Sequence, residues 1–210
     1  MKKKLFLTVL LAVFIAITCR AEELFVSEEV PGYKASWVNP SVDLREYEVI
    51  FIDTVNVDKV ELESDDLDLD DDNYGPRETE WRRKRTIAYK TARIFEKALS
   101  KVMPVVRNSD KIEGRKALIL EMSLQGHVNE TRLLSNLLPG SEGRRASVSI
   151  RCDIADHAAE KKIISVADTY ISGSPEENAS LLEVDNLDAW YGAMKIWAND
   201  LAIFIGRKRG

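Results

Sequence analysis

The sequence predicts an α+β fold, a two-layer sandwich with two long helices on one face of a mainly antiparallel sheet of about four strands. Three observations predict this class. Four segments have the composition or alternation of strands, two have apolar residues at helical spacing, and the elements follow in the order β-α-β-β-β-α. Because each helix and strand has one apolar side, the two layers are expected to bury those sides against each other.

The four predicted strands differ in pattern. Residues 47–55 read YEVIFIDTV, which is rich in β-branched and aromatic residues and is typical of a largely buried strand. In residues 116–128 and 146–156 apolar and polar side chains alternate, so one face of each strand is expected to be dry and the other wet. A short polar connection then leads to residues 163–172, which indicates an antiparallel hairpin.

Two segments predict long amphipathic helices. Residues 77–102 carry one apolar stripe before Pro104, which cannot continue a helix; its members are Trp81, Ala88, Ala92, Phe95, Leu99 and Val102. Residues 184–205 show the strongest helical period in the chain, with Trp190, Tyr191, Met194, Trp197, Leu201 and Phe204 among the apolar positions. Gly206 and the basic residues after it suit a helix C-terminus.

The first residues indicate export. Three lysines (Lys2, Lys3 and Lys4) precede the apolar run 5–17, the arrangement of a bacterial secretory signal. The run has about thirteen residues, whereas a membrane-spanning helix needs about twenty. We therefore expect residues 1–21 to be a signal peptide and the protein to work in the periplasm or at the outer membrane.

Two processing routes are open at the end of this segment. Cys19 and Ala21 satisfy the small-x-small rule for cleavage after Ala21, which would release the protein. Cleavage before Cys19 would instead make a lipoprotein, but residues 16–19 read AITC, a loose lipobox because Thr18 replaces a smaller residue. Release is the favoured interpretation, and membrane association is expected only if Cys19 is lipidated.

Without residues 1–21 the chain keeps 26 Lys and Arg against 35 Asp and Glu, a formal net charge of −9. This balance argues against nucleic acid as a partner. We expect a lead-in of packed coil at 22–46 and a single α+β domain at 47–206. Cys152 would be the only remaining cysteine, and its place on the dry side of a predicted strand indicates a buried small residue rather than a nucleophile.

An acidic loop is expected at residues 61–75, with six aspartates between 65 and 72. Its alternating aspartates resemble the start of a calcium loop, since calcium binds several carboxylate oxygens. The EF-hand register fails, however: counted from Asp66, the glycine position holds Asp71 and the glutamate position holds Arg77. A solvated loop beside the basic residues 82–85 is favoured, and an acidic calcium-binding module stays as an alternative.

Two surfaces are candidates for binding a protein partner from the bacterial envelope. Ser147, Ser149 and Arg151 are expected on the wet face of the sheet, which no predicted helix covers. Residues 131–145 supply a second candidate because four leucines there could form an exposed patch: Leu133, Leu134, Leu137 and Leu138. A segment of this kind more often folds back over the end of a sheet.

The sequence contains no catalytic constellation, metal-ligand set or cofactor motif that we can recognise, so we expect a non-catalytic accessory protein without cofactors. The alternative is a secreted hydrolase. His127 or His157 would then be the general base, oriented by one of three carboxylates, Asp153, Asp156 or Asp168.

Several short motifs resemble a known family. They are residues 37–40 (WVNP), residues 47–50 (YEVI), the long helix, and a strand pair whose second strand carries Asp168. Together with the secretion signal, they make residues 30–205 similar to the domain of unknown function 3313 family of bacterial envelope lipoproteins. The resemblance implies an envelope protein of undefined activity and supplies no catalytic residue. Thr18 departs from the good lipobox of that family.

Overall fold

The structure is a computed structural model that describes residues 29–63, 76–129, 147–171 and 186–210. Its elements are β1 (Ala35–Val38), the short 3-10 helix η1 (Leu44–Glu46), β2 (Val49–Glu63), α2 (Pro76–Leu99) and β3 (Val105–Val106). The chain continues with η2 (Ser109–Ile112), β4 (Ala117–Asn129), β5 (Ser147–Asp156), β6 (Lys162–Ile171) and α3 (Asn186–Arg209).

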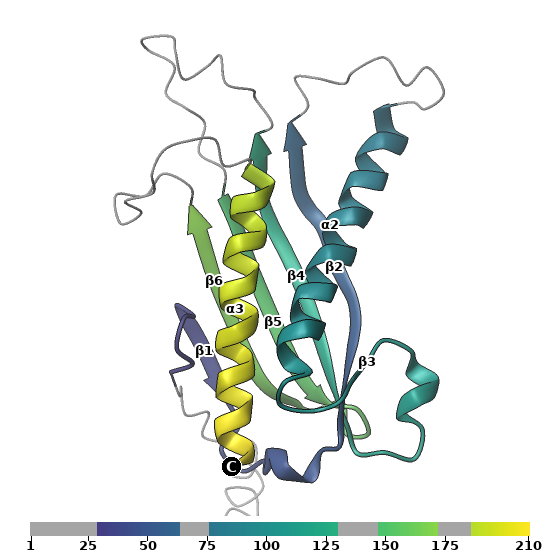
Figure 1. Ribbon diagram of the computed structural model, residues 1–210, viewed down its shortest axis with the longest axis vertical. Coiled ribbons are helices and arrows are strands. Elements are labelled where there is room, and N and C mark those ends of the chain that lie inside the picture. Colours follow the sequence, from purple (N-terminus) through teal and green to yellow (C-terminus); the bar gives the residue numbers. More distant parts are fainter. Residues whose placement is uncertain (1–28, 64–75, 130–146, 172–185) are drawn as a thin grey trace, which may run out of the picture.

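The strands form one six-stranded mixed sheet in the order β1-β6-β5-β4-β2-β3. The neighbours β4–β5, β5–β6 and β6–β1 are antiparallel, whereas β2 runs parallel to both β4 and β3. The parallel pair follows from the connection, because the chain returns from the end of β2 through α2 before it enters β4. Figure 1 shows this return as the long teal helix beside β2.

Both long helices lie on the same face of the sheet (Figure 1). Phe95 and Leu99 of α2 and Trp190 and Met194 of α3 are fully buried. Beneath the helices, every second residue of β5 is buried from Val148 to Ile154. Burial of so much apolar surface is the main stabilising contribution in a domain of this size.

A smaller apolar cluster lies on the opposite face, at one end of the sheet. Val49, Ile112 and Ala117 are its buried members, and Phe51 and Val106 pack against them. Val49 and Ala117 are paired in neighbouring strands, and η2 supplies Ile112 as the cover. The rest of this face is lined largely by polar side chains of β4 and β5.

The fold class predicted from the sequence was wrong in its sheet. The sheet has six strands rather than about four, it is mixed, and the order of elements along the chain differs, although the fold is α+β overall. The two additional strands are β1, of four residues, and β3, of two. Segments this short cannot display an alternation of apolar and polar residues, so the pattern that predicts strands is missing.

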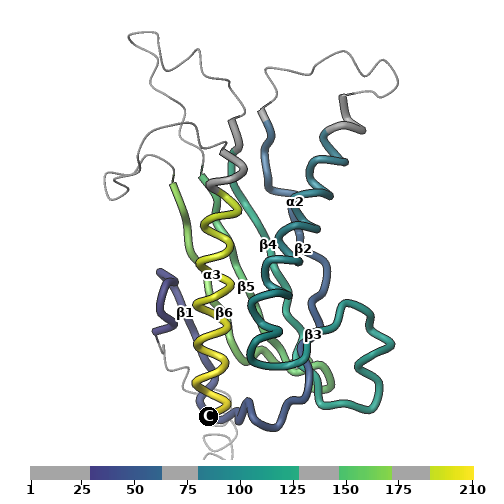
Figure 2. The backbone as a smooth tube through the Cα atoms, in the orientation of Figure 1, coloured from purple at the N-terminus to yellow at the C-terminus, as the bar shows by residue number. Residues whose placement is uncertain are grey.

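The described part of the predicted lead-in is therefore not packed coil throughout, because it contains β1. Its residues 35–38 pair antiparallel with β6, from Ala35 opposite Ala167 to Val38 opposite Ile164. Figure 2 shows this purple segment beside β6, with the C-terminus of α3 at the same end of the molecule as η1. Among the described residues, no helix has the length and apolar character that a membrane crossing requires.

Candidate functional site

The sheet face opposite α2 and α3, here called the open face, is the best-defined polar surface of the described chain. The alternation of β5 turns Ser149, Arg151 and Asp153 toward it, while Ile150 and Cys152 turn toward the helices. Glu121, Ser123 and Gln125 of β4 lie on the same face, since they pair with Asp153, Arg151 and Ser149. All three of these β4 residues are exposed.

Asp153 is the centre of a polar cluster on this face. Its Oδ2 lies 3.1 Å from Nε of Arg151 and 2.8 Å from Nζ of Lys162, and its Oδ1 accepts a hydrogen bond from the Ser165 hydroxyl. Partial burial alone would raise the pKa of Asp153, but the hydrogen bonds from Lys162 and Ser165 and the nearby cations outweigh it and lower the pKa. The carboxylate is thus held ionised between two cations.

The side chains of Arg151 and Lys162 are accessible to a partner. Their side chains are 57% and 41% exposed, whereas that of Asp153 is 17% exposed. A shallow hollow of about 240 Å³ lies next to Arg151, lined by the β2 residues Asp53, Thr54 and Asn56 together with β4 and β5 side chains. The β2 register shifts between Ile52 and Val55, and this irregularity borders the hollow.

The predicted partner residues of β5 are brought together on one surface. Ser149 shares a hydrogen bond of 2.9 Å with Thr169 of β6, and Ser147 lies at the end of the strand opposite His127. The second predicted surface, comprising Leu133, Leu134, Leu137 and Leu138, lies outside the described residues, as do Cys19 and the acidic residues 64–75. These three hypotheses stay predictions.

The hydrolase alternative placed a base on His127 or His157. The structure puts them at opposite ends of β4: His127 is a residue of that strand close to its end, and the His157 backbone N–H donates to Ala117 at its beginning. The His127 Nδ1 lies 3.5 Å from a carboxylate oxygen of Glu61. Glu61 is not one of the three carboxylates that the hydrolase alternative proposed for orienting the base.

Those three carboxylates have other contacts. Asp153 belongs to the open-face cluster, Asp156 accepts a hydrogen bond of 2.7 Å from the Tyr47 hydroxyl, and Asp168 accepts one of 2.7 Å from the Trp197 ring nitrogen. Asp168 faces α3 and not the open face. Within the described ranges, no three His, Cys, Asp or Glu side chains are grouped in a way that could hold a metal ion.

Cys152 is fully buried, as its strand position predicts. Burial raises the pKa of its thiol far above the usual range, because no water stabilises the thiolate there. A thiol that stays protonated is a poor nucleophile. Cys152 therefore contributes to packing between the sheet and the helices.

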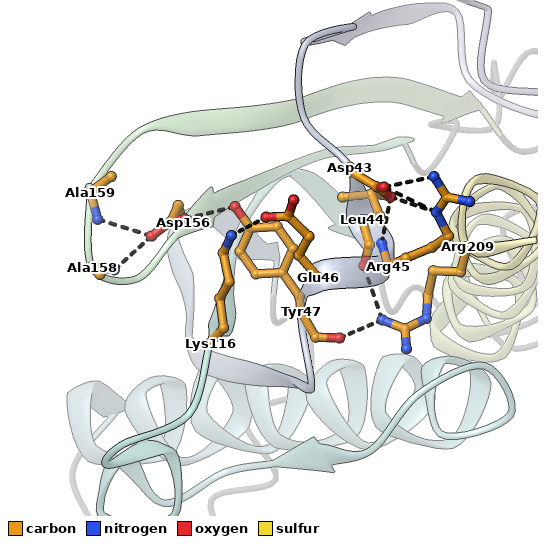
Figure 3. A network of polar contacts seen from close by, with 10 residues as sticks. All are labelled: Asp43, Leu44, Arg45, Glu46, Tyr47, Lys116, Asp156, Ala158, Ala159 and Arg209. Atoms are coloured by element: carbon orange, nitrogen blue, oxygen red, sulfur yellow. Dashed lines mark hydrogen bonds and ion pairs between the residues drawn. The ribbon is translucent and has the colours of Figure 1, made fainter.

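A second polar network joins the beginning of β2 to the turn after β5 (Figure 3). The Tyr47 hydroxyl donates to Asp156, whose Oδ1 also accepts from the backbone amides of Ala158 and Ala159. These hydrogen bonds lower the pKa of Asp156, and the bond from Tyr47 contributes most. The Lys116 ammonium lies 5.0 Å from the centre of the Tyr47 ring and pairs with Glu46. Every contact in this network joins parts of the fold, so its role is structural.

Sequence reasoning missed Lys162, Ser165 and Thr169 as members of the open-face surface. All three lie on β6, and each reaches a β5 side chain across the hairpin. The alternation of β5 was visible in the sequence, but the residues opposite depend on the hairpin register. That register is set by the turn, where Glu160 has a φ of 51° without being glycine.

No protein-family model and no curated protein matches this chain. Among solved structures, it is similar to the PelC dodecamer from Paraburkholderia phytofirmans, with 10% identity, a TM-score of 0.41, and coverage of 75% of this chain and 88% of that one. It is also similar to protein XCC0632 from Xanthomonas campestris, of family DUF330, with 10% identity, a TM-score of 0.43, and coverage of 81% and 90%.

A third similar structure is a neuraminyllactose-binding hemagglutinin homolog from Helicobacter pylori, with 11% identity and a TM-score of 0.35 over 78% of this chain and 86% of that one. At these TM-scores and identities, the likenesses establish neither the family nor the function of this chain. The resemblance to the domain of unknown function 3313 family stays a prediction.

Proposed function

We propose that this protein is a non-catalytic accessory protein of the bacterial envelope that binds a protein partner through its open face. The observation that carries the proposal is the cluster of Arg151, Asp153 and Lys162, in which two partly exposed cations are held in place by one ionised carboxylate. Ordered, partly exposed charges on a sheet face favour recognition of a partner of complementary charge.

The envelope location is supported by the signal-like residues 1–21 and by the resemblance of residues 30–205 to the domain of unknown function 3313 family of envelope lipoproteins. The non-catalytic role is supported by the contacts of the candidate catalytic groups. The two histidines lie at opposite ends of β4, and Asp153, Asp156 and Asp168 are each engaged by other side chains.

Site-specific crosslinking in living cells tests the open face. A photoreactive amino acid at Gln125, an exposed position next to Ser149, should yield one discrete crosslinked product from the envelope. The product should be lost on Arg151→Glu and kept on Arg151→Lys, which preserves the positive charge. The same photoreactive residue at Ile196, 61% exposed on α3, is the matched control and should not yield it.

Two results would contradict the proposal. One is an identical product from Gln125 and Ile196, and the other is a product that Arg151→Glu leaves unchanged. The non-catalytic part has its own test, because replacing both His127 and His157 by alanine should preserve any phenotype that the gene supports. Loss of the phenotype in a folded double variant would favour the hydrolase alternative.

A further inference from the structure

The outer edge of β2 is paired over only part of its length. Val105 and Val106 of β3 pair with Ile50 and Phe51, and the Ile50 N–H donates to the Pro104 carbonyl at 2.9 Å. Beyond Phe51, no other strand of the described sheet pairs with this edge. An edge strand in this state presents backbone N–H and C=O groups that can pair with an added strand.

A cleft of about 500 Å³ lies beside this edge, where β3 would continue if it were longer. We call it the β2-edge cleft. Residues 51–55 of β2 form one wall. The end of the cleft nearest β3 is formed by the residues that follow that strand: Arg107, Asn108 and Ser109. Residues of α2 form the other wall: Arg85, Ala88, Tyr89 and Ala92. The cleft therefore borders the backbone edge of β2 and is also lined by side chains that could contact the side chains of a bound segment.

Two arginine–aromatic pairs line or border the cleft. The Arg85 guanidinium lies 5.2 Å from the centre of the Trp81 ring, and the Arg107 guanidinium lies 5.2 Å from that of Tyr89. Trp81 and Tyr89 are 57% and 56% exposed, although the sequence pattern placed Trp81 in the apolar stripe of its helix. Since Trp81, Arg85 and Tyr89 are spaced by four residues, they lie along one side of α2.

This arrangement suits acidic side chains. A guanidinium stacked on a ring keeps its N–H donors in the plane, where they can bind a carboxylate with two hydrogen bonds. Among the described residues that line the cleft, one carries a carboxylate: Asp53, which accepts a hydrogen bond of 2.7 Å from the Thr54 N–H. The described lining of the cleft thus carries two cations, Arg85 and Arg107, against one anion, in a chain whose formal net charge is −5.

We propose that the β2-edge cleft binds an extended acidic segment of a partner protein, which adds to the sheet as a strand beside β2 and in line with β3. Main-chain hydrogen bonds to the β2 edge would supply affinity, and carboxylates at Arg85 and Arg107 would supply selectivity. This surface does not include Arg151 or Lys162, so the proposal can fail or succeed separately from the function proposed for the open face.

A fluorescently labelled eight-residue peptide that alternates glutamate and valine is a suitable probe. Its binding to the protein without the predicted signal peptide, residues 22–210, is measured by fluorescence anisotropy. We expect saturable binding, at least tenfold tighter than that of the same peptide with lysine in place of glutamate. Two N-methylated forms test strand addition. One form is methylated on the backbone amides of the glutamates and the other on those of the valines, so each form blocks one edge of the extended peptide. One form should not bind, and the other should bind with an affinity within about threefold of the parent peptide, because only one edge of the peptide pairs with β2.

Charge-reversed variants place the site. Arg85→Glu combined with Arg107→Glu should weaken binding at least tenfold, and both residues lie on the surface, so the fold should be kept. Arg207→Glu, an exposed arginine near the end of α3, is the matched control and should bind as the parent does. Arg151→Glu should also bind as the parent does, which separates this site from the open face.

Four peptide-binding results would overturn the proposal. They are absence of binding at millimolar peptide, equal binding of the lysine peptide, equal binding of both methylated peptides, and binding that appears only after residues 64–75 are deleted. The last would mean that the acidic segment of this chain occupies the cleft. A dimer in sedimentation velocity that the double charge reversal dissociates would assign the edge to a second copy, which also contradicts the proposal.

Discussion

Gly126 of β4, which pairs with Val148 of β5, allows a close approach between two strands near one end of the sheet. A Cβ atom added there would lie 2.1 Å from the carbonyl oxygen of Ser147 and 2.9 Å from the Cα of Val148. Both atoms belong to the backbone of β5, so neither can rotate away as a flexible side chain would. Any larger residue at this position has to push the paired strands apart.

Gly126→Ala is therefore expected to lower the free energy of unfolding by about 2–3 kcal/mol, measured by urea denaturation. Gly192→Ala is the matched control, since Gly192 lies inside α3 with no heavy atom within 4 Å of the added Cβ. There alanine should stabilise the helix by up to about 1 kcal/mol. Equal stability of the Gly126 variant and the parent would show that β4 and β5 do not approach as closely as described.

The hydrogen bond between Tyr47 and Asp156 should make stability depend on pH in the acid range. Because the pKa of Asp156 is lowered in the folded protein, its ionised form contributes stability above the ordinary carboxyl pKa of about 3.9. That contribution is lost as the pH falls through the lower folded-state pKa. Tyr47→Phe removes the largest cause of the shift.

We expect Tyr47→Phe to lower the free energy of unfolding by about 1 kcal/mol at pH 7, and this difference should shrink as the pH falls below about 4. Solvent near the partly exposed carboxylate keeps the effect small. Thermal unfolding followed from pH 7 to pH 3 measures it, with Tyr89→Phe at an exposed position as the control. A difference that stays constant over this range would argue against Asp156 as the titrating partner.

At the scale of one element, the Arg209 side chain ties the C-terminal end of α3 to the segment that precedes β2. The Arg209 Nη1 donates to the carbonyl oxygens of Leu44, at 3.1 Å, and Tyr47, at 2.6 Å (Figure 3). Leu44 is the first residue of η1, and Tyr47 follows η1 and precedes β2. Arg209 is also a cation in the last turn, where it interacts favourably with the helix dipole.

Arg209→Ala should lower the free energy of unfolding by about 1–2 kcal/mol, because two carbonyl groups lose a charged donor. Hydrogen exchange should increase around residues 44–47 before it changes elsewhere. Arg207→Ala, an exposed cation in the same last turn, is the control and should cost no more than a few tenths of a kcal/mol. Matching exchange in the two variants would mean that Arg209 does not hold η1 in place.

The long elements were predictable because periodicity needs length. Residues 116–128, 146–156 and 163–172 were predicted as strands and are observed as β4, β5 and β6 with shifts of one residue at most ends. The first predicted strand, 47–55, is longer in the structure and extends to Glu63 across two register shifts. Irregularities of this kind interrupt the alternation, so the pattern stops before the strand does.

Strand pairing was harder to predict than the strands themselves. A strand, a long helix and another strand form the unit that usually pairs in parallel, and β2, α2 and β4 follow that rule. The hairpin between β5 and β6 was visible, but its register and hence the contacts of Lys162 and Ser165 were not. The β2-edge cleft depends on β3 ending after two residues, which no sequence pattern marks.

At the scale of the whole molecule, the function proposed here requires export, and residues 16–21 decide how the exported chain is finished. Cleavage after Ala21 needs small residues at positions 19 and 21, whereas lipoprotein processing needs the Cys19 thiol itself. Serine is small and lacks the thiol. Cys19→Ser therefore separates the two routes in a single substitution.

We expect the mature protein to begin at Glu22 and to stay in the soluble envelope fraction, as shown by intact mass spectrometry of fractionated cells. Cys19→Ser should leave both results unchanged, since serine still satisfies the small-x-small rule. Ala21→Arg is the positive control and should cause the precursor to accumulate. If Cys19→Ser instead accumulates precursor, and the parent carries acyl chains on Cys19, the protein is anchored by lipid, because several chains on one residue bind a membrane stably. Its open face and its β2-edge cleft would then have to find their partners at the membrane surface.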